Sequence, residues 1–77
     1  MLAHEQLYPV KAFVRCLTRP VRFITINEWR IAASSAHQAI YRFRQQFSQK
    51  YPTWEIIWGQ VPDLLKSDHS LLLFRGD

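Results

Sequence analysis

The sequence is poor in the residues on which many catalytic and structural scaffolds depend. Cys16 is its only cysteine, which excludes intrachain disulfides and is typical of a protein in a reducing compartment. Two glycines in 77 residues provide no glycine-rich phosphate-binding loop and no nucleophile elbow. The longest uninterrupted apolar run is LLLF at 71–74, far shorter than a membrane-spanning helix requires. We therefore expect neither a disulfide scaffold nor a membrane protein.

Residue spacings that bind metals or support catalysis are also missing. The three histidines, His4, His37 and His69, are far from one another and from Cys16, and no C-x-x-C, H-x-x-x-H or H-E-x-x-H spacing occurs. The six Asp and Glu residues are scattered along the chain. We therefore expect no metal, no cofactor and no enzymatic activity. The least favoured alternative is a toxin-like ribonuclease, which needs only an acid–base pair built from histidine and arginine.

The composition favours one small folded domain that spans residues 1–77. With 48% hydrophobic and 14% aromatic residues, the chain is too apolar for a disordered tail and too short for a second core. The N-terminal residues MLAHEQLYPVK show no basic start followed by an apolar run, so no signal peptide is predicted. A cytoplasmic protein is expected.

Charge is unevenly distributed along the chain, whose net charge is +4. Residues 1–50 contain eight Lys and Arg against Glu5 and Glu28, whereas residues 51–77 contain two basic and four acidic residues. A basic body of this kind favours an acidic partner, either nucleic acid or protein.

The first third of the chain is predicted to form strands. PVKAFVRCLT (9–18) alternates, VRFITI (21–26) is β-branched and aromatic, and TRP (18–20) between them is typical of a turn. The hydrophobic phase then slips at Asn27-Glu28, which indicates either a bulge or a tight turn. We favour the turn, followed by a third short strand at 29–33.

One helix is clearly indicated after these strands. Ser35 and Gln38 have the spacing of a capping box, which satisfies two backbone donors at a helix start. Tyr51-Pro52 is the expected end, because the residue before proline is pushed out of the helical region. An apolar stripe at helical spacing is formed by Ala36, Ala39, Ile40, Phe43 and Phe47.

Two further strands are predicted, TWEIIWGQV (53–61) and SLLLFR (70–75), separated at 62–69 by a turn or a single helical turn. In the first of them we expect one face to carry Trp54, Ile56 and Trp58, and the other to carry Ile57 and Val61. The chain is thus predicted to adopt an α+β, two-layer fold of order β-β-(β)-α-β-(β). One helix packs on a small, mostly antiparallel sheet.

A single helix can cover only one face of such a sheet. Cys16 is expected on the covered face with Val10 and Val14, as a buried, inert thiol. Phe13, either Ile57 or the tryptophans, and much of LLLF are expected on the other face, where an exposed apolar patch usually marks a partner site.

Candidate contact residues form two groups. On the helix, His37, Tyr41 and Arg44 follow one stripe, and Arg42 and Lys50 lie on another. On the strands the candidates are Lys11, Arg15, Arg22 and Arg30, of which Lys11 and Arg15 share a face with Phe13. These residues either contact phosphates or carboxylates of a partner, or form an ordinary solvated surface. A basic and aromatic sheet face can also stack nucleic-acid bases.

The segment WRIAASSAHQAI (29–40) runs from a short strand through small residues and serine into a capped helix. It resembles a recurring segment of small phage and mobile-element proteins, and the β-β-α-β plan is similar to that of several anti-CRISPR inhibitors. The resemblance implies a non-catalytic inhibitor that docks on a bacterial nucleoprotein complex, such as a CRISPR effector, in the host cytosol. Many such inhibitors are acidic mimics of nucleic acid, whereas this chain is basic.

The leading hypothesis from sequence is therefore a small non-enzymatic binding protein that acts on a bacterial protein or nucleoprotein complex. A basic nucleic-acid-binding module is the alternative. Either form is compatible with a homodimer through the apolar strand Ser70–Arg75, which could pair across a two-fold axis.

Overall fold

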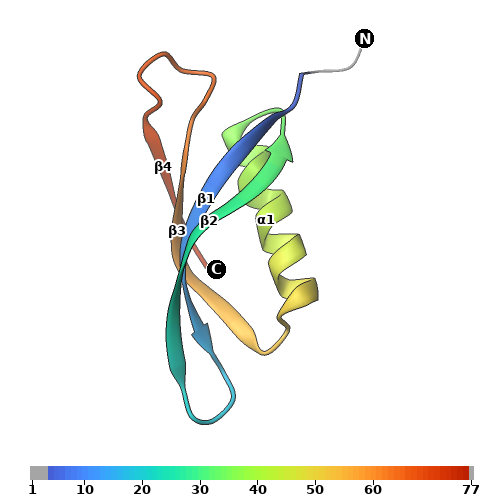
Figure 1. Cartoon of the computed structure of the whole chain (residues 1–77), viewed down its shortest axis with the longest axis vertical. Coiled ribbons are helices and arrows are strands. Elements are labelled where there is room, and N and C mark those ends of the chain that lie inside the picture. The colour runs from blue at the N-terminus through green and yellow to red at the C-terminus, as the bar shows by residue number, and fades with distance from the viewer. Residues whose placement is uncertain (1–3, 77) are drawn as a thin grey trace.

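A computed structural model describes residues 4–76 of the chain. Its elements are β1 (Gln6–Cys16), β2 (Arg22–Ala33), α1 (Ala36–Lys50), β3 (Trp54–Pro62) and β4 (Leu71–Arg75). The strands form one sheet in the order β2-β1-β3-β4, and every neighbouring pair is antiparallel. α1 lies on one side of this sheet (Figure 1), so the predicted α+β, two-layer fold is confirmed.

The predicted turn at Asn27-Glu28, with a separate third strand at 29–33, is wrong. β2 continues through these residues as one strand, and the phase slip is a bulge in its pairing with β1. Val10 pairs with Trp29 and Ala12 pairs with Ile26, so two residues of β2 oppose one residue of β1. Because of this extra residue, the apolar side chains of β2 before and after the bulge lie on the same face of the sheet, the one that α1 covers.

A second irregularity in the pairing corrects the predicted faces of β3. Phe13 pairs with Trp58 but Val14 pairs with Ile56, which leaves Ile57 as the extra residue. Trp58 therefore lies on the face of the sheet away from α1, whereas Trp54 and Ile56 lie on the face that α1 covers. The buried residues beyond the shift, Gly59 and Val61, return to the covered face.

α1 begins and ends where the sequence predicts. Ser35 is its N-cap, and the backbone N–H of Gln38 donates to Ser35 Oγ at 3.1 Å. The reciprocal bond differs from the expected capping box, because Gln38 Oε1 accepts from the N–H of Ser34 at 2.8 Å. At the other end, the N–H of Tyr51 donates to the carbonyl of Phe47.

The core lies between α1 and the sheet, directly over the central strand β1. Alternate residues of β1 are buried from Tyr8 to Cys16, which confirms the predicted buried thiol. From α1, Phe43 makes edge-to-face contacts with Trp29 at 5.3 Å and Phe74 at 6.0 Å between ring centroids. Each such buried side chain contributes ~1.5–3 kcal/mol of transfer free energy. The residues of α1 buried in this core are Ala36, Ala39, Phe43 and Phe47.

Candidate functional site

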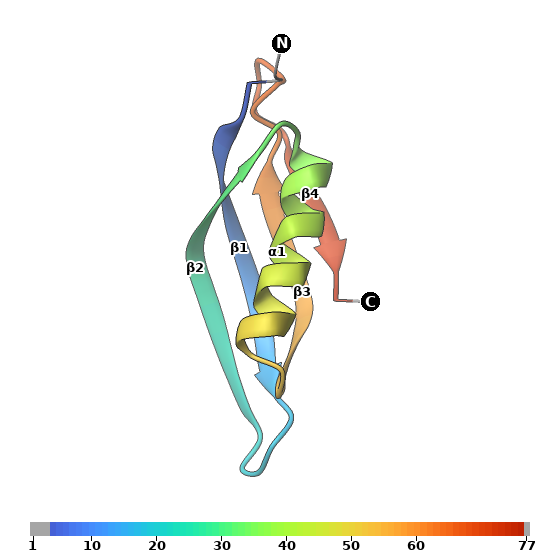
Figure 2. The ribbon, with the colours of Figure 1, turned by 90° about the vertical axis from the view of Figure 1, so that its right-hand side faces the viewer.

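The face of the sheet that α1 leaves uncovered carries a continuous row of large side chains. Figure 2 shows α1 in front of the central strands, and in Figure 1 no other helix or strand of residues 4–76 packs on the far side of the sheet. Cross-strand pairing places side chains that lie directly opposite one another on the same face. We call this surface the open face; among the residues that the pairings assign to it are Leu7, Lys11, Phe13, Arg15, Phe23, Thr25, Glu55, Trp58, Gln60, Leu71, Leu73 and Arg75.

The centre of the open face is aromatic and exposed. The rings of Phe13 and Phe23 are stacked, with centroids 5.6 Å apart and planes 8° from parallel. Trp58 lies opposite Phe13 on the next strand and is 43% exposed, and Leu73 on β4 is 71% exposed. The sequence predicted Phe13, part of LLLF and, as one of two alternatives, the tryptophans here, but not Phe23 as part of the patch.

The charges of the open face lie around this aromatic centre. Arg15 forms an ion pair with Glu55, directly opposite it on β3. Lys11 is exposed and pairs in register with Gln60, while Arg75 lies opposite Trp58. Among residues 4–76, no ion pair involves Lys11 or Arg75, so both charges are available to a ligand.

The helix arginines that the sequence singled out are engaged within the fold. Arg42 Nη1 donates to the carbonyl of Ala32 at 2.7 Å and to Glu5 Oε2 at 3.0 Å. Arg44 donates to the carbonyl of Arg75 and its guanidinium lies 5.3 Å from the ring centroid of Phe74. These two residues tie α1 to β2 and β4 respectively.

The remaining helix candidates differ from the arginines in their contacts. His37 is exposed, and Tyr41 is exposed with its hydroxyl accepting from Gln45 Nε2 at 3.0 Å. Lys50, in the last turn of α1, places Nζ 5.9 Å from the ring centroids of Trp29 and Tyr51. These three residues face away from the open face, so the predicted contacts do not form one surface.

The two remaining candidates lie near opposite ends of β2, where Arg22 pairs in register with Cys16 and Arg30 with Pro9. Arg30 Nε contacts Glu28 Oε2 at 2.6 Å in an exposed ion pair. Arg22 is near Cys16, whose Sγ is 3.0 Å from the hydroxyl oxygen of Thr18. The hydrogen bond with Thr18 lowers the pKa of the Cys16 thiol, and the positive charge of Arg22 lowers it further. Burial acts in the opposite direction and raises this pKa, but its effect is smaller.

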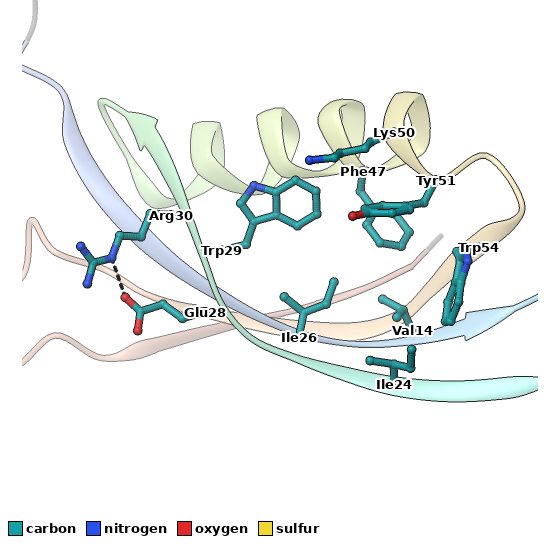
Figure 3. Close-up of a pocket in the computed structure, with 10 residues that line it drawn as sticks. All are labelled: Val14, Ile24, Ile26, Glu28, Trp29, Arg30, Phe47, Lys50, Tyr51 and Trp54. Carbon is teal, nitrogen blue, oxygen red and sulfur yellow. Dashed lines mark hydrogen bonds and ion pairs between the residues drawn. The ribbon is translucent and has the colours of Figure 1, made fainter.

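A groove of about 450 Å³ opens on the covered side of the sheet, at the C-terminal end of α1. Figure 3 shows its aromatic wall, with Trp29, Phe47 and Tyr51 near the helix and Trp54 at one end. The sequence pattern marked these residues only as core, strand or helix-end positions. The groove forms because the long β1–β2 hairpin extends beyond the end of α1 (Figure 1), a feature that no local pattern indicates. Its lining consists of Val14, Ile24, Ile26, Glu28, Trp29, Arg30, Phe47, Lys50, Tyr51 and Trp54.

The outer edge of β4 is a third candidate surface. The N–H of Gly76 donates to the carbonyl of Ile57 across the β3–β4 pair. Because these bonds alternate along an antiparallel strand, the backbone groups of Leu71, Leu73 and Arg75 point away from β3. The carbonyl of Arg75 is occupied by Arg44, which leaves Leu71 and Leu73 as the open part of the edge.

Other kinds of site receive no support from the part of the chain that the structure describes. Residues 4–76 contain no cluster of three or more His, Cys, Asp or Glu side chains arranged to hold a metal ion. Within the same range, no helix has both the length and the apolar character needed to span a bilayer. Compared with family models, curated proteins and solved structures, the chain matches none.

Proposed function

We propose that this protein is a non-enzymatic binding protein that docks through its open face on an apolar, acidic-rimmed surface of another protein. The observation that carries the proposal is the contiguity of the patch. Large apolar side chains from all four strands remain exposed on one uncovered sheet face, namely Leu7, Phe23, Trp58, Leu71 and Leu73. Such a patch is typical of an interaction surface in a small domain.

The arrangement of charge favours a protein partner over a nucleic acid. The basic group nearest the aromatic centre is neutralised, because Arg15 forms an ion pair with Glu55. Lys11 and Arg75, which make no ion pair within residues 4–76, lie beside an apolar centre. An apolar centre with a polar rim is the usual anatomy of a protein–protein interface, and the two cations complement acidic groups on the partner.

A comparison of matched variants tests this proposal. The double substitution Phe23→Ser with Leu73→Ser removes apolar surface from the open face, whereas Tyr41→Ser with Leu65→Ser removes side chains of similar exposure elsewhere. We expect proteins captured from a nuclease-treated bacterial lysate by the unchanged chain to be retained by the second variant and lost by the first. Capture that survives the open-face variant and disappears with the Tyr41 variant would assign binding to the helix and contradict the proposal.

A nucleic-acid-binding function is the second candidate, because one specific observation favours it. Phe13, Phe23 and Trp58 share a sheet face with Lys11 and Arg15, and aromatic rings beside cations can stack bases. Under this alternative, the affinity for single-stranded RNA or DNA falls steeply between low and physiological salt as counterions are released. Binding through a protein interface centred on apolar side chains is much less sensitive to salt.

The most concrete form of the proposed function is an anti-CRISPR-like inhibitor that acts on a bacterial CRISPR effector complex. It is supported by the resemblance of residues 29–40 and by the plan of one helix on a small antiparallel sheet. We expect the protein to reduce interference against a targeted plasmid in bacteria, and the open-face variant to restore interference. If interference stays complete in the presence of the unchanged protein for every effector type tested, the anti-CRISPR form of the proposal is excluded. The lysate-capture experiment then still tests binding through the open face.

We also propose that the edge of β4, the strand at the centre of Ser70–Arg75, pairs with a second copy of the chain. Its outward backbone groups at Leu71 and Leu73 are open to a partner strand, and an unprotected edge of this kind readily adds one. Antiparallel pairing about a two-fold axis would join two open faces into a wider surface.

A further inference from the structure

The groove at the end of α1 exists because the β1–β2 hairpin is longer than the helix that packs on it. α1 ends at Lys50, whereas β1 and β2 continue as a hairpin beyond it, as Figure 1 shows. The helix-facing residues of that extension therefore have no helix above them. Ile24, on the floor of the groove, is 47% exposed although it pairs with the buried Val14.

The wall of the groove is held in place by ring contacts. The ring of Trp29 packs edge-on against Phe47 at 6.1 Å and Tyr51 at 6.2 Å between centroids, and Phe47 and Tyr51 are 5.5 Å apart. Figure 3 shows these rings along the helix side, facing Ile26 and Ile24 on the sheet. A wall fixed in this way loses little conformational entropy when a ligand enters.

The charges around the groove are not balanced. Glu28 and Arg30, at one end, form an ion pair with each other. Lys50 contacts only rings among the interactions of residues 4–76: its Nζ lies 5.9 Å from the centroids of both Trp29 and Tyr51. Because Glu28 and Arg30 neutralise each other, the groove presents an apolar, aromatic surface whose one cation without an ion pair in residues 4–76 is Lys50, at the rim.

We propose that this groove binds a small amphipathic organic anion, with its apolar body among Trp29, Tyr51 and Trp54 and its anionic group on Nζ of Lys50. The volume of about 450 Å³ lies within the roughly 300–1,000 Å³ that is usual for small-molecule sites. The single cation selects for one negative charge and against positively charged ligands. The site lies on the opposite side of the sheet from the open face, so it is independent of the proposed docking function.

The three tryptophans provide a built-in test. Trp29 and Trp54 line the groove, whereas Trp58 lies on the open face, so their indole N–H signals in nuclear magnetic resonance spectra distinguish the two surfaces. We expect decanoate, added below its micelle concentration, to shift the signals of Trp29 and Trp54 and to leave that of Trp58 unchanged. Decylammonium, which has a chain of the same length and the opposite charge, should bind at least several-fold more weakly.

Two variants and two matched controls locate the site. Lys50→Gln should weaken decanoate binding roughly two- to fivefold, the range measured for partly exposed ion pairs, and Ile24→Ser should weaken it further by shrinking the apolar floor. Lys66→Gln and Leu65→Ser make the same chemical changes at exposed positions outside the groove, and should bind as the unchanged chain does. Dispersed spectra of each variant show that the fold is retained.

Several outcomes would overturn the proposal. Equal shifts of all three indole signals would indicate non-specific adsorption of decanoate. Equal decanoate affinities of Lys50→Gln and the unchanged chain would show that Lys50 does not contact the anionic group. An acidic peptide with one tryptophan that shifts Trp29 and Trp54 at much lower concentration than decanoate would assign the groove to a protein segment instead. The open-face variant should still bind decanoate, so failure here and failure of the docking proposal remain distinguishable.

Discussion

At the scale of single residues, Tyr8 places a polar atom in the middle of the core. Its side chain is fully buried, and its hydroxyl has no hydrogen-bond partner among the described residues. Burial raises the pKa of the Tyr8 hydroxyl above its ordinary value, and the negative charge of Asp63 raises it further. The hydroxyl therefore costs desolvation without a compensating bond.

We predict that Tyr8→Phe leaves the free energy of unfolding unchanged or raises it by up to about 1 kcal/mol, because it removes a buried group that lacks a partner. Urea unfolding at neutral pH measures this change. Destabilisation by more than the error of that measurement would mean that the hydroxyl is satisfied in solution.

The same residue predicts a loss of stability at high pH. The pKa of Tyr8 is above 10.0 in the folded chain and near that value in the unfolded chain, so its stabilising contribution is fully present below about pH 10. Above it, the unfolded chain releases the proton first and stability falls. Tyr8→Phe should make this alkaline loss shallower in urea titrations from pH 8 to 11; identical pH profiles for the two proteins would contradict the assignment.

Gly59 is a second position where one residue determines local packing. A Cβ at this position would lie 2.3 Å from Cζ of Phe74 and 2.9 Å from the carbonyl oxygen of Lys11. We predict that Gly59→Ala lowers the free energy of unfolding by about 1–3 kcal/mol, as expected for overpacking. Gln60→Ala, on the adjacent position of the open face, is the control and should change stability by much less.

At the scale of elements, the arginines of α1 act as ties between the helix and the sheet. We predict that Arg42→Ala lowers the free energy of unfolding by about 0.5–1.5 kcal/mol, because the carbonyl of Ala32 loses its donor. Arg19→Ala, in the exposed β1–β2 loop, is the control. Equal stability of both variants, measured by thermal and urea unfolding, would show that the Arg42 contacts contribute nothing.

The edge of β4 predicts a concentration-dependent dimer. Leu73→Pro removes an N–H that points away from β3, so it should prevent pairing with a second copy while leaving the β3–β4 ladder in place. Leu73→Ala keeps that N–H and is the matched control. We expect dimers of the unchanged chain and of Leu73→Ala in sedimentation at micromolar concentration, and monomers of Leu73→Pro. Monomers throughout would exclude the edge as an interface.

Local patterns predicted the elements of this fold better than their pairing. The ends of α1 were predictable because Ser35 and Tyr51-Pro52 act through neighbouring residues. The slip at Asn27-Glu28 was visible in the sequence, but a turn and a bulge produce the same slip. Only the pairing of β2 with distant residues of β1 distinguishes the two. The same limit applies to Trp58, whose face depends on the irregularity at Ile57.

At the scale of the whole molecule, the candidate residues separate onto different sides of the sheet. Sequence spacing grouped His37, Tyr41, Arg42 and Arg44 as contacts, yet the fold uses both arginines to hold α1 in place. The open face could be predicted in outline, since one helix covers one face. Its full composition could not, because the membership of Phe23, and the choice between Ile57 and Trp58, depend on strand register.

The central claim is that a protein partner contacts the open face, and site-specific photo-crosslinking in living bacteria tests it most directly. A benzophenone amino acid would replace Phe23 on the open face in one protein and Tyr41 on α1 in another; both side chains are large and exposed. The account predicts a protein adduct from position 23 and none from position 41. Adducts from position 41 alone, or adducts from position 23 that contain only nucleic acid, would contradict it.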